Sequence, residues 1–80
     1  MYSDKKILVT GGTGMIGSHL VELLVEKGAN VRIIEHEREV PDELKKLELD
    51  IMRGDLTDRK FSDNVVKNME YIFHLAAYTG

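Results

Sequence analysis

The sequence contains no cysteine, so disulfide bonds and thiolate metal sites are both excluded. It also lacks an excess of basic residues: its formal net charge is −3, which argues against a nucleic-acid partner. Long apolar runs are missing too: the apolar run that follows the charged N-terminal residues is only Ile7, Leu8 and Val9 before Gly11 interrupts. That run is too short for a signal sequence or for the ~20 residues that cross a bilayer. We therefore expect a cytoplasmic protein without membrane or nucleic-acid partners.

What the sequence does contain is an alternation of short apolar runs with amphipathic runs. Its 80 residues, 42% hydrophobic and 31% charged, fit at most one small soluble domain. Apolar runs predict strands at residues 6–10, 30–35, 49–53 and 71–75. Helical spacing predicts helices over 15–27, from Pro41 onward, and from Thr57 or Asp58 to about Asn68. This β-α-β-α-β-α-β order is typical of an α/β fold, a parallel sheet with helices on both sides.

Each predicted helix has a candidate inward face. The residues that we expect to turn toward a core are Ile16, Leu20, Leu23 and Leu24 in the first helix, Leu44 and Leu47 in the second, and Phe61, Val65 and Met69 in the third.

Three glycines follow the first predicted strand at intervals of three residues. Gly11 permits a tight turn, Gly14 lets backbone approach a pyrophosphate, and Gly17 lets the helix pack closely. Free N–H groups and the positive end of the helix dipole then favour a phosphate. The spacing is G-x-x-G-x-x-G rather than the dehydrogenase G-x-G-x-x-G. A mononucleotide phosphate loop requires Lys-Ser or Lys-Thr after the glycines, and neither pair follows them here. An ordinary strand-to-helix turn is the alternative.

A carboxylate stands at the end of the second predicted strand. Glu35 lies 24 residues after Gly11, where an acidic side chain can accept hydrogen bonds from the adenosine ribose hydroxyls. It would repel a 2′-phosphate, so NAD is expected rather than NADP. The alternative is that Glu35 is one of the solvated charges of residues 35–39, and the nearby His36 and Arg38 weaken the discrimination.

Three segments together, from Thr10 to Gly17, from Gly54 to Asp58 and from Phe73 to Ala77, resemble the extended short-chain dehydrogenase/reductase family. The nucleotide-sugar epimerases and dehydratases are its best-known members. The resemblance covers nearly all of the chain but only the first part of such an enzyme. It implies a Rossmann-type four-stranded parallel sheet in the order 3-2-1-4, so we expect residues 1–80 to form a partial NAD(P)-binding domain without a substrate domain.

The same resemblance assigns roles to residues around the cofactor. It implies that Met15 and Ile16 offer backbone N–H groups to the pyrophosphate, that Asp55 binds the adenine amino group beside Leu56, and that Leu75, Ala76 and Ala77 pass beneath the cofactor. Alternatively, Asp55 caps the turn after the third strand, and Ala76 and Ala77 only pack. His19, His36 and His74 share no metal-ligand spacing, so no metal site is expected.

Catalysis in the resembled family depends on a tyrosine with a lysine four residues later. Tyr71 is followed at that interval by Leu75. For Tyr78 the fourth position would be residue 82, beyond the 80 residues of the sequence. Tyr2 precedes Lys6, but ahead of the first strand, where the family has no such motif. We therefore expect no catalytic residue and no turnover: the chain is the cofactor-binding segment of an NAD-dependent nucleotide-sugar epimerase or dehydratase. The alternatives are a stand-alone dinucleotide-binding or redox-sensor module, or a folded fragment without a ligand.

The fourth predicted strand ends the pattern. In the resembled family the sheet continues beyond it, so it would here form an unprotected apolar edge. We expect marginal stability and self-association through this edge.

Overall fold

The computed structural model describes residues 4–11, 15–36 and 40–74. Its elements are β1 (Lys6–Thr10), α1 (Met15–Glu26), β2 (Asn30–Glu35), α2 (Asp42–Lys45), β3 (Asp50–Arg53), α3 (Arg59–Val65) and β4 (Tyr71–His74). The four strands are parallel and lie in the order β3-β2-β1-β4. This architecture confirms the predicted α/β class and the predicted strand order.

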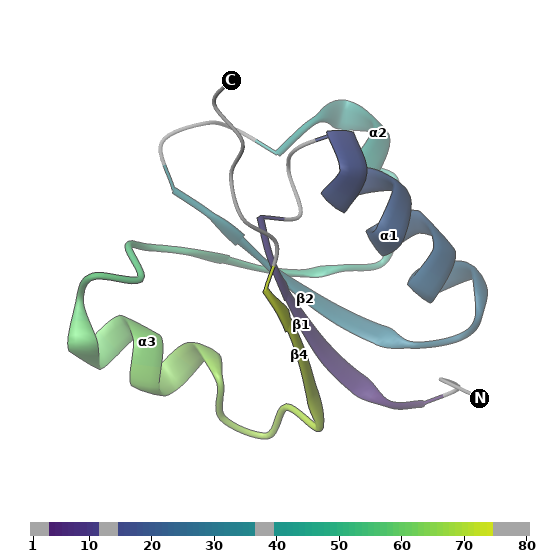
Figure 1. Ribbon diagram of the computed structural model, residues 1–80. Helices are drawn as coiled ribbons and strands as arrows, with labels where there is room; N and C mark the ends of the chain where they lie inside the picture. Colours follow the sequence, from purple (N-terminus) through teal and green to yellow (C-terminus); the bar gives the residue numbers. More distant parts are fainter. Residues whose placement is uncertain (1–3, 12–14, 37–39, 75–80) are drawn as a thin grey trace.

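The helices lie on both sides of the sheet. Figure 1 shows α1 and α2 on one side and α3 on the other. Because the strands are parallel and in register, with Ile33 beside Val9 and Val9 beside Phe73, their carboxyl ends meet at one edge of the sheet. That edge therefore carries the turns into all three helices, which is where ligands bind in open sheets of this kind.

The main hydrophobic core lies between the sheet and the pair α1 and α2. Alternate residues of β1 and β2 face it, and its fully or nearly fully buried members are Ile7, Val9, Val21, Leu24, Val31, Ile33, Val40 and Leu44. Burial of each large aliphatic side chain contributes about 1.5–3 kcal/mol. On the opposite face, Leu8 of β1 and Val65 of α3 are also buried. The predicted core positions Leu24, Leu44 and Val65 are confirmed.

Two details of the helices differ from the expectations. Leu23 is 48% exposed, so its predicted inward orientation is wrong; Val21 is buried in its place. Five of the six residues from Leu20 to Val25 are apolar, and their spacing fits more than one helical face. The third helix ends at Val65 rather than near Asn68, because Asn68 takes a left-handed conformation with φ 66°.

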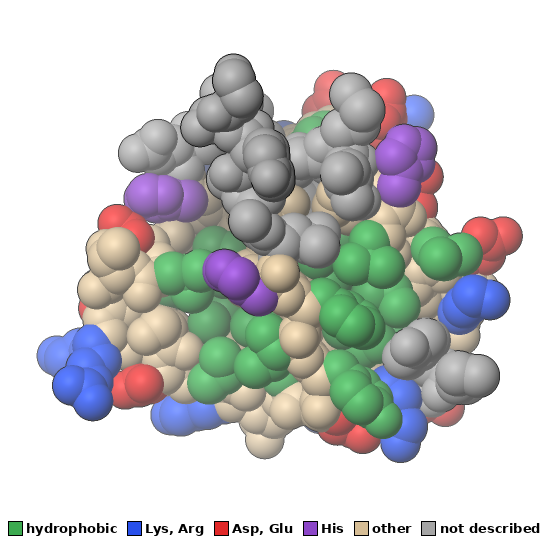
Figure 2. Space-filling model, in the orientation of Figure 1, with side chains coloured by type: hydrophobic (Ala, Val, Ile, Leu, Met, Phe, Trp, Pro, Cys, Tyr) green, Lys and Arg blue, Asp and Glu red, His purple; other side chains and the backbone are tan. Residues whose placement is uncertain are grey.

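The strand β4 forms one edge of the sheet. Tyr71 and Ile72 expose 47% and 52% of their surface. Figure 2 shows hydrophobic side chains at the surface of this face of the molecule. The expected apolar edge strand is thus present in the described part of the chain. Within that part, no helix is long and apolar enough to cross a membrane.

Candidate functional site

The predicted phosphate-binding turn begins at the end of β1. Gly11 has φ 78°, in the left-handed region where a Cβ would be strained, as a tight turn out of the strand requires. α1 then begins at Met15, so the first backbone N–H groups of the helix, including those of Met15 and Ile16, have no partner within the helix itself. The first turn of α1 contains no acidic residue that would oppose an anion.

Two other glycines belong to the same predicted turn. Gly17 lies in α1 and is buried, which agrees with its predicted role of letting this helix pack closely. Gly14 lies outside the described residues, as do Leu75, Ala76 and Ala77.

Glu35 ends β2 with its carboxylate turned toward the protein. The Glu35 side chain is only 15% exposed, which excludes the alternative of a solvated acid. Its Oε2 accepts a hydrogen bond from the Val40 backbone N–H at 2.8 Å, and its Oε1 lies 3.6 Å from Nη1 of Arg53. An ionised carboxylate has about four acceptor positions, so these contacts leave lone pairs for further donors such as ribose hydroxyls.

Asp55 follows β3 and closes the turn into α3. Its Oδ1 accepts the Thr57 backbone N–H at 2.9 Å, and its carbonyl oxygen accepts the Asp58 N–H at 2.9 Å. The predicted turn-capping role is therefore present. The Thr57 backbone N–H, then the Thr57 hydroxyl, and more weakly the charge of His36 hold the pKa of the Asp55 carboxyl below its ordinary value. Asp55 is thus an acceptor at neutral pH.

Main-chain and side-chain contacts join the ends of β2 and β3. The Gly54 N–H donates to the Glu35 carbonyl oxygen at 3.0 Å. One residue further along the chain in each case, His36 Nε2 lies 3.4 Å from Asp55 Oδ2. Both side chains are about half exposed, at 50% and 45%. The two predicted carboxylates therefore belong to one small region of the carboxyl edge.

The surroundings of these carboxylates include residues that the sequence analysis did not assign. Arg53 and the Val40 backbone hold Glu35, and the Phe61 ring lies over Gly54. The signal for Arg53 was its place at the carboxyl end of a strand adjacent to Glu35. Phe61 gives no such signal, since its helical spacing predicts only a core residue. Leu56, predicted to line an adenine pocket, is 41% exposed.

The remaining histidines do not join this group in the described structure. His74 is exposed at the end of β4, where its Nδ1 lies within hydrogen-bond distance of the buried Thr10 hydroxyl. His19 is exposed on α1. Among the residues that the structure describes, no three His, Cys, Asp or Glu side chains gather in a way that could hold a metal ion.

Comparison with known proteins agrees with this geometry. A family model described as the NAD dependent epimerase/dehydratase family matches residues 7–80. A putative dihydroflavonol 4-reductase of Synechocystis sp. is 39% identical over 70 residues, which are 88% of this chain and 20% of that protein. dTDP-D-glucose 4,6-dehydratase of Dictyostelium discoideum is 34% identical over 85 residues, covering 94% of this chain and 20% of that protein.

A solved structure shares the fold at comparable identity. MoeE5 in complex with UDP-glucuronic acid and NAD matches with a TM-score of 0.75 and 43% identity, over 94% of this chain and 23% of that chain. The chain thus spans about a fifth of the length of the curated relatives that it matches.

Proposed function

The chain belongs to the NAD dependent epimerase/dehydratase family, and from that premise we propose that it binds the adenosine side of NAD at the carboxyl edge of its sheet. The observation that carries the proposal is the placement of three features at that edge. These are the Gly11 turn leading into α1, the carboxylate of Glu35, and the carboxylate of Asp55. A phosphate, a ribose diol and an exocyclic amino group can be bound by these three features in this order.

Each part of the dinucleotide has its own contact in the proposal. The N–H groups of Met15 and Ile16 bind the pyrophosphate, with Gly11 and Gly14 shaping the turn and Gly17 the packing of the helix. Leu75, Ala76 and Ala77 pass beneath the cofactor. The NAD complex of MoeE5 supports this arrangement by likeness.

The preference between NAD and NADP depends on Glu35. Its carboxylate accepts the ribose hydroxyls and repels a 2′-phosphate, which favours NAD. Arg53, 75% exposed and 3.6 Å from Glu35, offsets part of that negative charge. The proposed preference for NAD is therefore moderate rather than absolute.

The activity that we propose for the longer protein is epimerisation or dehydration of a nucleotide sugar. The support is dTDP-D-glucose 4,6-dehydratase and MoeE5, the latter solved with UDP-glucuronic acid. In this proposal residues 1–80 supply cofactor binding, and the proton-transferring tyrosine and lysine lie outside them. Tyr71 has Leu75 and not lysine at the fourth position, and the Tyr2–Lys6 pair precedes the first strand. When bound, NAD would supply hydride transfer.

Isothermal titration calorimetry of the 80-residue chain with NAD, ADP and NADP tests the binding proposal. We expect NAD and ADP to bind with similar affinity, because both carry the adenosine diphosphate, and NADP to bind more weakly. A tenfold or greater advantage of NAD over ADP, equal to about 1.4 kcal/mol from the nicotinamide side, would contradict the adenosine-side assignment. Absence of binding by all three would contradict the proposed function.

A further inference from the structure

The helix α3 packs against the turn that carries Asp55 through the aromatic ring of Phe61. A Cβ built on Gly54 would lie 2.3 Å from Cδ1 and 2.4 Å from Cε1 of Phe61, so the ring occupies the space that any larger residue at Gly54 would need. Phe61 belongs to the first turn of α3, whose N-cap Asp58 accepts the backbone N–H groups of Lys60 and Phe61. The first turn of the helix and the Gly54–Asp55 turn therefore form one packed unit.

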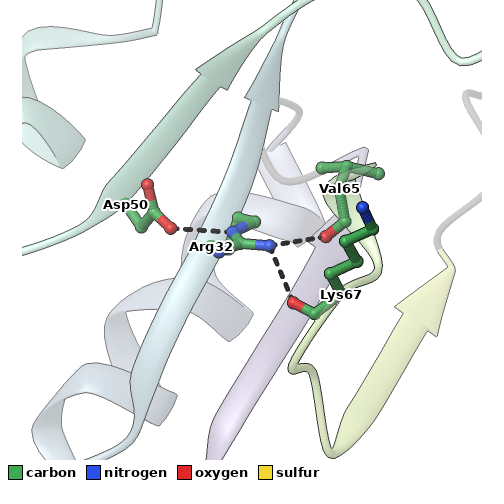
Figure 3. A network of polar contacts seen from close by, with 4 residues as sticks. All are labelled: Arg32, Asp50, Val65 and Lys67. Carbon is green, nitrogen blue, oxygen red and sulfur yellow. Dashed lines mark hydrogen bonds and ion pairs between the residues drawn. The ribbon is translucent and has the colours of Figure 1, made fainter. Parts of the chain in front are cut away.

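The other end of α3 is held by Arg32 from the middle of β2. Its Nη1 donates to the carbonyl oxygens of Val65 at 2.8 Å and Lys67 at 3.2 Å, while its Nε donates to Asp50 Oδ2 at 2.7 Å (Figure 3). The Arg32 side chain is only 16% exposed. Nη1 of Arg32 thus satisfies the Val65 carbonyl group at the end of the helix, which has no partner within the helix, and the Lys67 carbonyl group just beyond it.

These contacts matter for the position of the helix because α3 is short. It has seven residues, and an isolated helix of that length is not stable in water. Its placement therefore depends on tertiary contacts, of which Arg32 at one end, Val65 in the interior and Phe61 at the other end are the described ones. A continuous path of contacts runs from Arg32 through α3 and Phe61 to Gly54, the neighbour of Asp55.

We propose that Arg32 and Phe61 are positioning residues for adenine recognition: together they hold α3 so that the Asp55 carboxylate meets the adenine amino group. This inference rests on the proposed function, in which Asp55 accepts that amino group. A hydrogen bond weakens steeply as its angle and length depart from the optimum. Small displacements of the Gly54–Asp55 turn therefore reduce affinity for the amino group specifically, without affecting the pyrophosphate contacts at α1.

The test compares NAD with its hypoxanthine analogue, in which a carbonyl oxygen replaces the adenine amino group. Calorimetry is done on the 80-residue chain and on two variants: Arg32→Met, which keeps an unbranched aliphatic stem but lacks the guanidinium group, and Phe61→Leu, which keeps an apolar side chain. The wild type should prefer NAD by about tenfold, as one hydrogen bond to a charged group implies. In both variants the preference should fall to about threefold or less, while affinity for the hypoxanthine analogue stays unchanged.

Arg59→Met is the matched control, because it makes the same change at an exposed position of α3 and should leave the preference intact. Melting temperatures are recorded for every variant, and Phe61→Leu supplies the test if Arg32→Met does not fold. Equal loss of affinity for both dinucleotides, or an unchanged preference in a folded variant, would overturn the positioning role alone. A wild type that binds neither dinucleotide refutes the proposed function itself, and the positioning role with it.

Discussion

The Gly54 N–H donates a hydrogen bond of 3.0 Å to the carbonyl oxygen of Glu35. This bond continues the pairing of β2 with β3 one step beyond the Glu35–Arg53 pair. It holds the backbone that carries Glu35 against the backbone that precedes Asp55, so this main-chain bond contributes to the separation of the two carboxylates. In the proposed function, that separation corresponds to the distance between ribose and adenine of one bound nucleotide.

Removing the charge of Glu35 should reduce the preference for NAD over NADP. Glu35→Gln keeps an oxygen that can accept the Val40 N–H but removes the negative charge that repels a 2′-phosphate. We expect the NAD/NADP affinity ratio to fall by about tenfold, because repulsion between two negative charges about 4 Å apart costs roughly 1–4 kcal/mol near a protein surface. Calorimetric titration with both dinucleotides measures the ratio.

Glu35→Ala separates binding from stability at the same position. Val40 is 1% exposed, so its N–H would lose its acceptor in a buried place, and we expect the free energy of unfolding to fall by about 1–3 kcal/mol. Urea denaturation measures this loss, which Glu35→Gln should largely avoid. An unchanged NAD/NADP ratio in both variants would remove Glu35 from the site.

The Asp55 carboxyl should titrate below its ordinary pKa in the folded chain, chiefly because Thr57 donates two hydrogen bonds to it. A depressed folded-state pKa means that Asp55 contributes stability above the unfolded pKa and loses it as the pH falls through the folded pKa. Thr57→Val removes the hydroxyl but keeps the backbone N–H, so the Asp55 pKa should rise only part of the way. Carboxyl-carbon NMR titration follows both proteins. A wild-type pKa at or above the ordinary aspartate value would show that the described turn is wrong.

Gly54→Ala should destabilise the chain, because the new methyl group would meet the Phe61 ring at 2.3 Å. Overpacking of this kind costs about 1–3 kcal/mol in the free energy of unfolding. The double variant Gly54→Ala/Phe61→Leu should recover part of the loss, since the smaller side chain can move aside. Chemical denaturation of the two single variants and the double variant gives the coupling free energy between positions 54 and 61. Strict additivity of the two losses would contradict the contact.

Self-association through β4 is expected to increase with protein concentration, because its apolar outer residues form an edge. Ile72→Lys places a charge on this strand at a site that is already 52% exposed and should shift sedimentation toward the monomer. Leu23→Lys, at a 48% exposed site on α1, is the matched control and should not. A wild type that sediments as a monomer at every concentration would contradict the expectation.

The elements that the sequence predicted best are those with a local signal. β1 and β2 have the predicted bounds, residues 6–10 and 30–35, and Pro41 precedes α2 as expected. The predicted end of α3 is wrong because the chain leaves the helix before Asn68, whose φ is 66°, and because Arg32, 33 residues away from Val65 in the sequence, donates to the Val65 carbonyl oxygen. No helical periodicity carries that information.

For the candidate site, too, the sequence predicts the features with a local signal and not the contacts that depend on the fold. The glycine spacing and Glu35 followed from the position of a turn and of a strand end, and Gly11 has the conformation that the turn required. The partners of Glu35 were not predictable, since Val40 and Arg53 reach it only through the fold. The packing of Phe61 on Gly54 likewise depends on how α3 crosses the sheet.

The central claim, an adenosine diphosphate site at the carboxyl edge, is tested most directly by NMR titration of the labelled chain with ADP. The account predicts saturable chemical-shift changes of the backbone amides of Gly11, Met15, Ile16 and the Gly54–Thr57 turn. The amide shifts of Tyr71 and of the other residues at the amino ends of the strands should stay unchanged. Shifts confined to the amino ends of the strands, or no saturable shift at all, would contradict it.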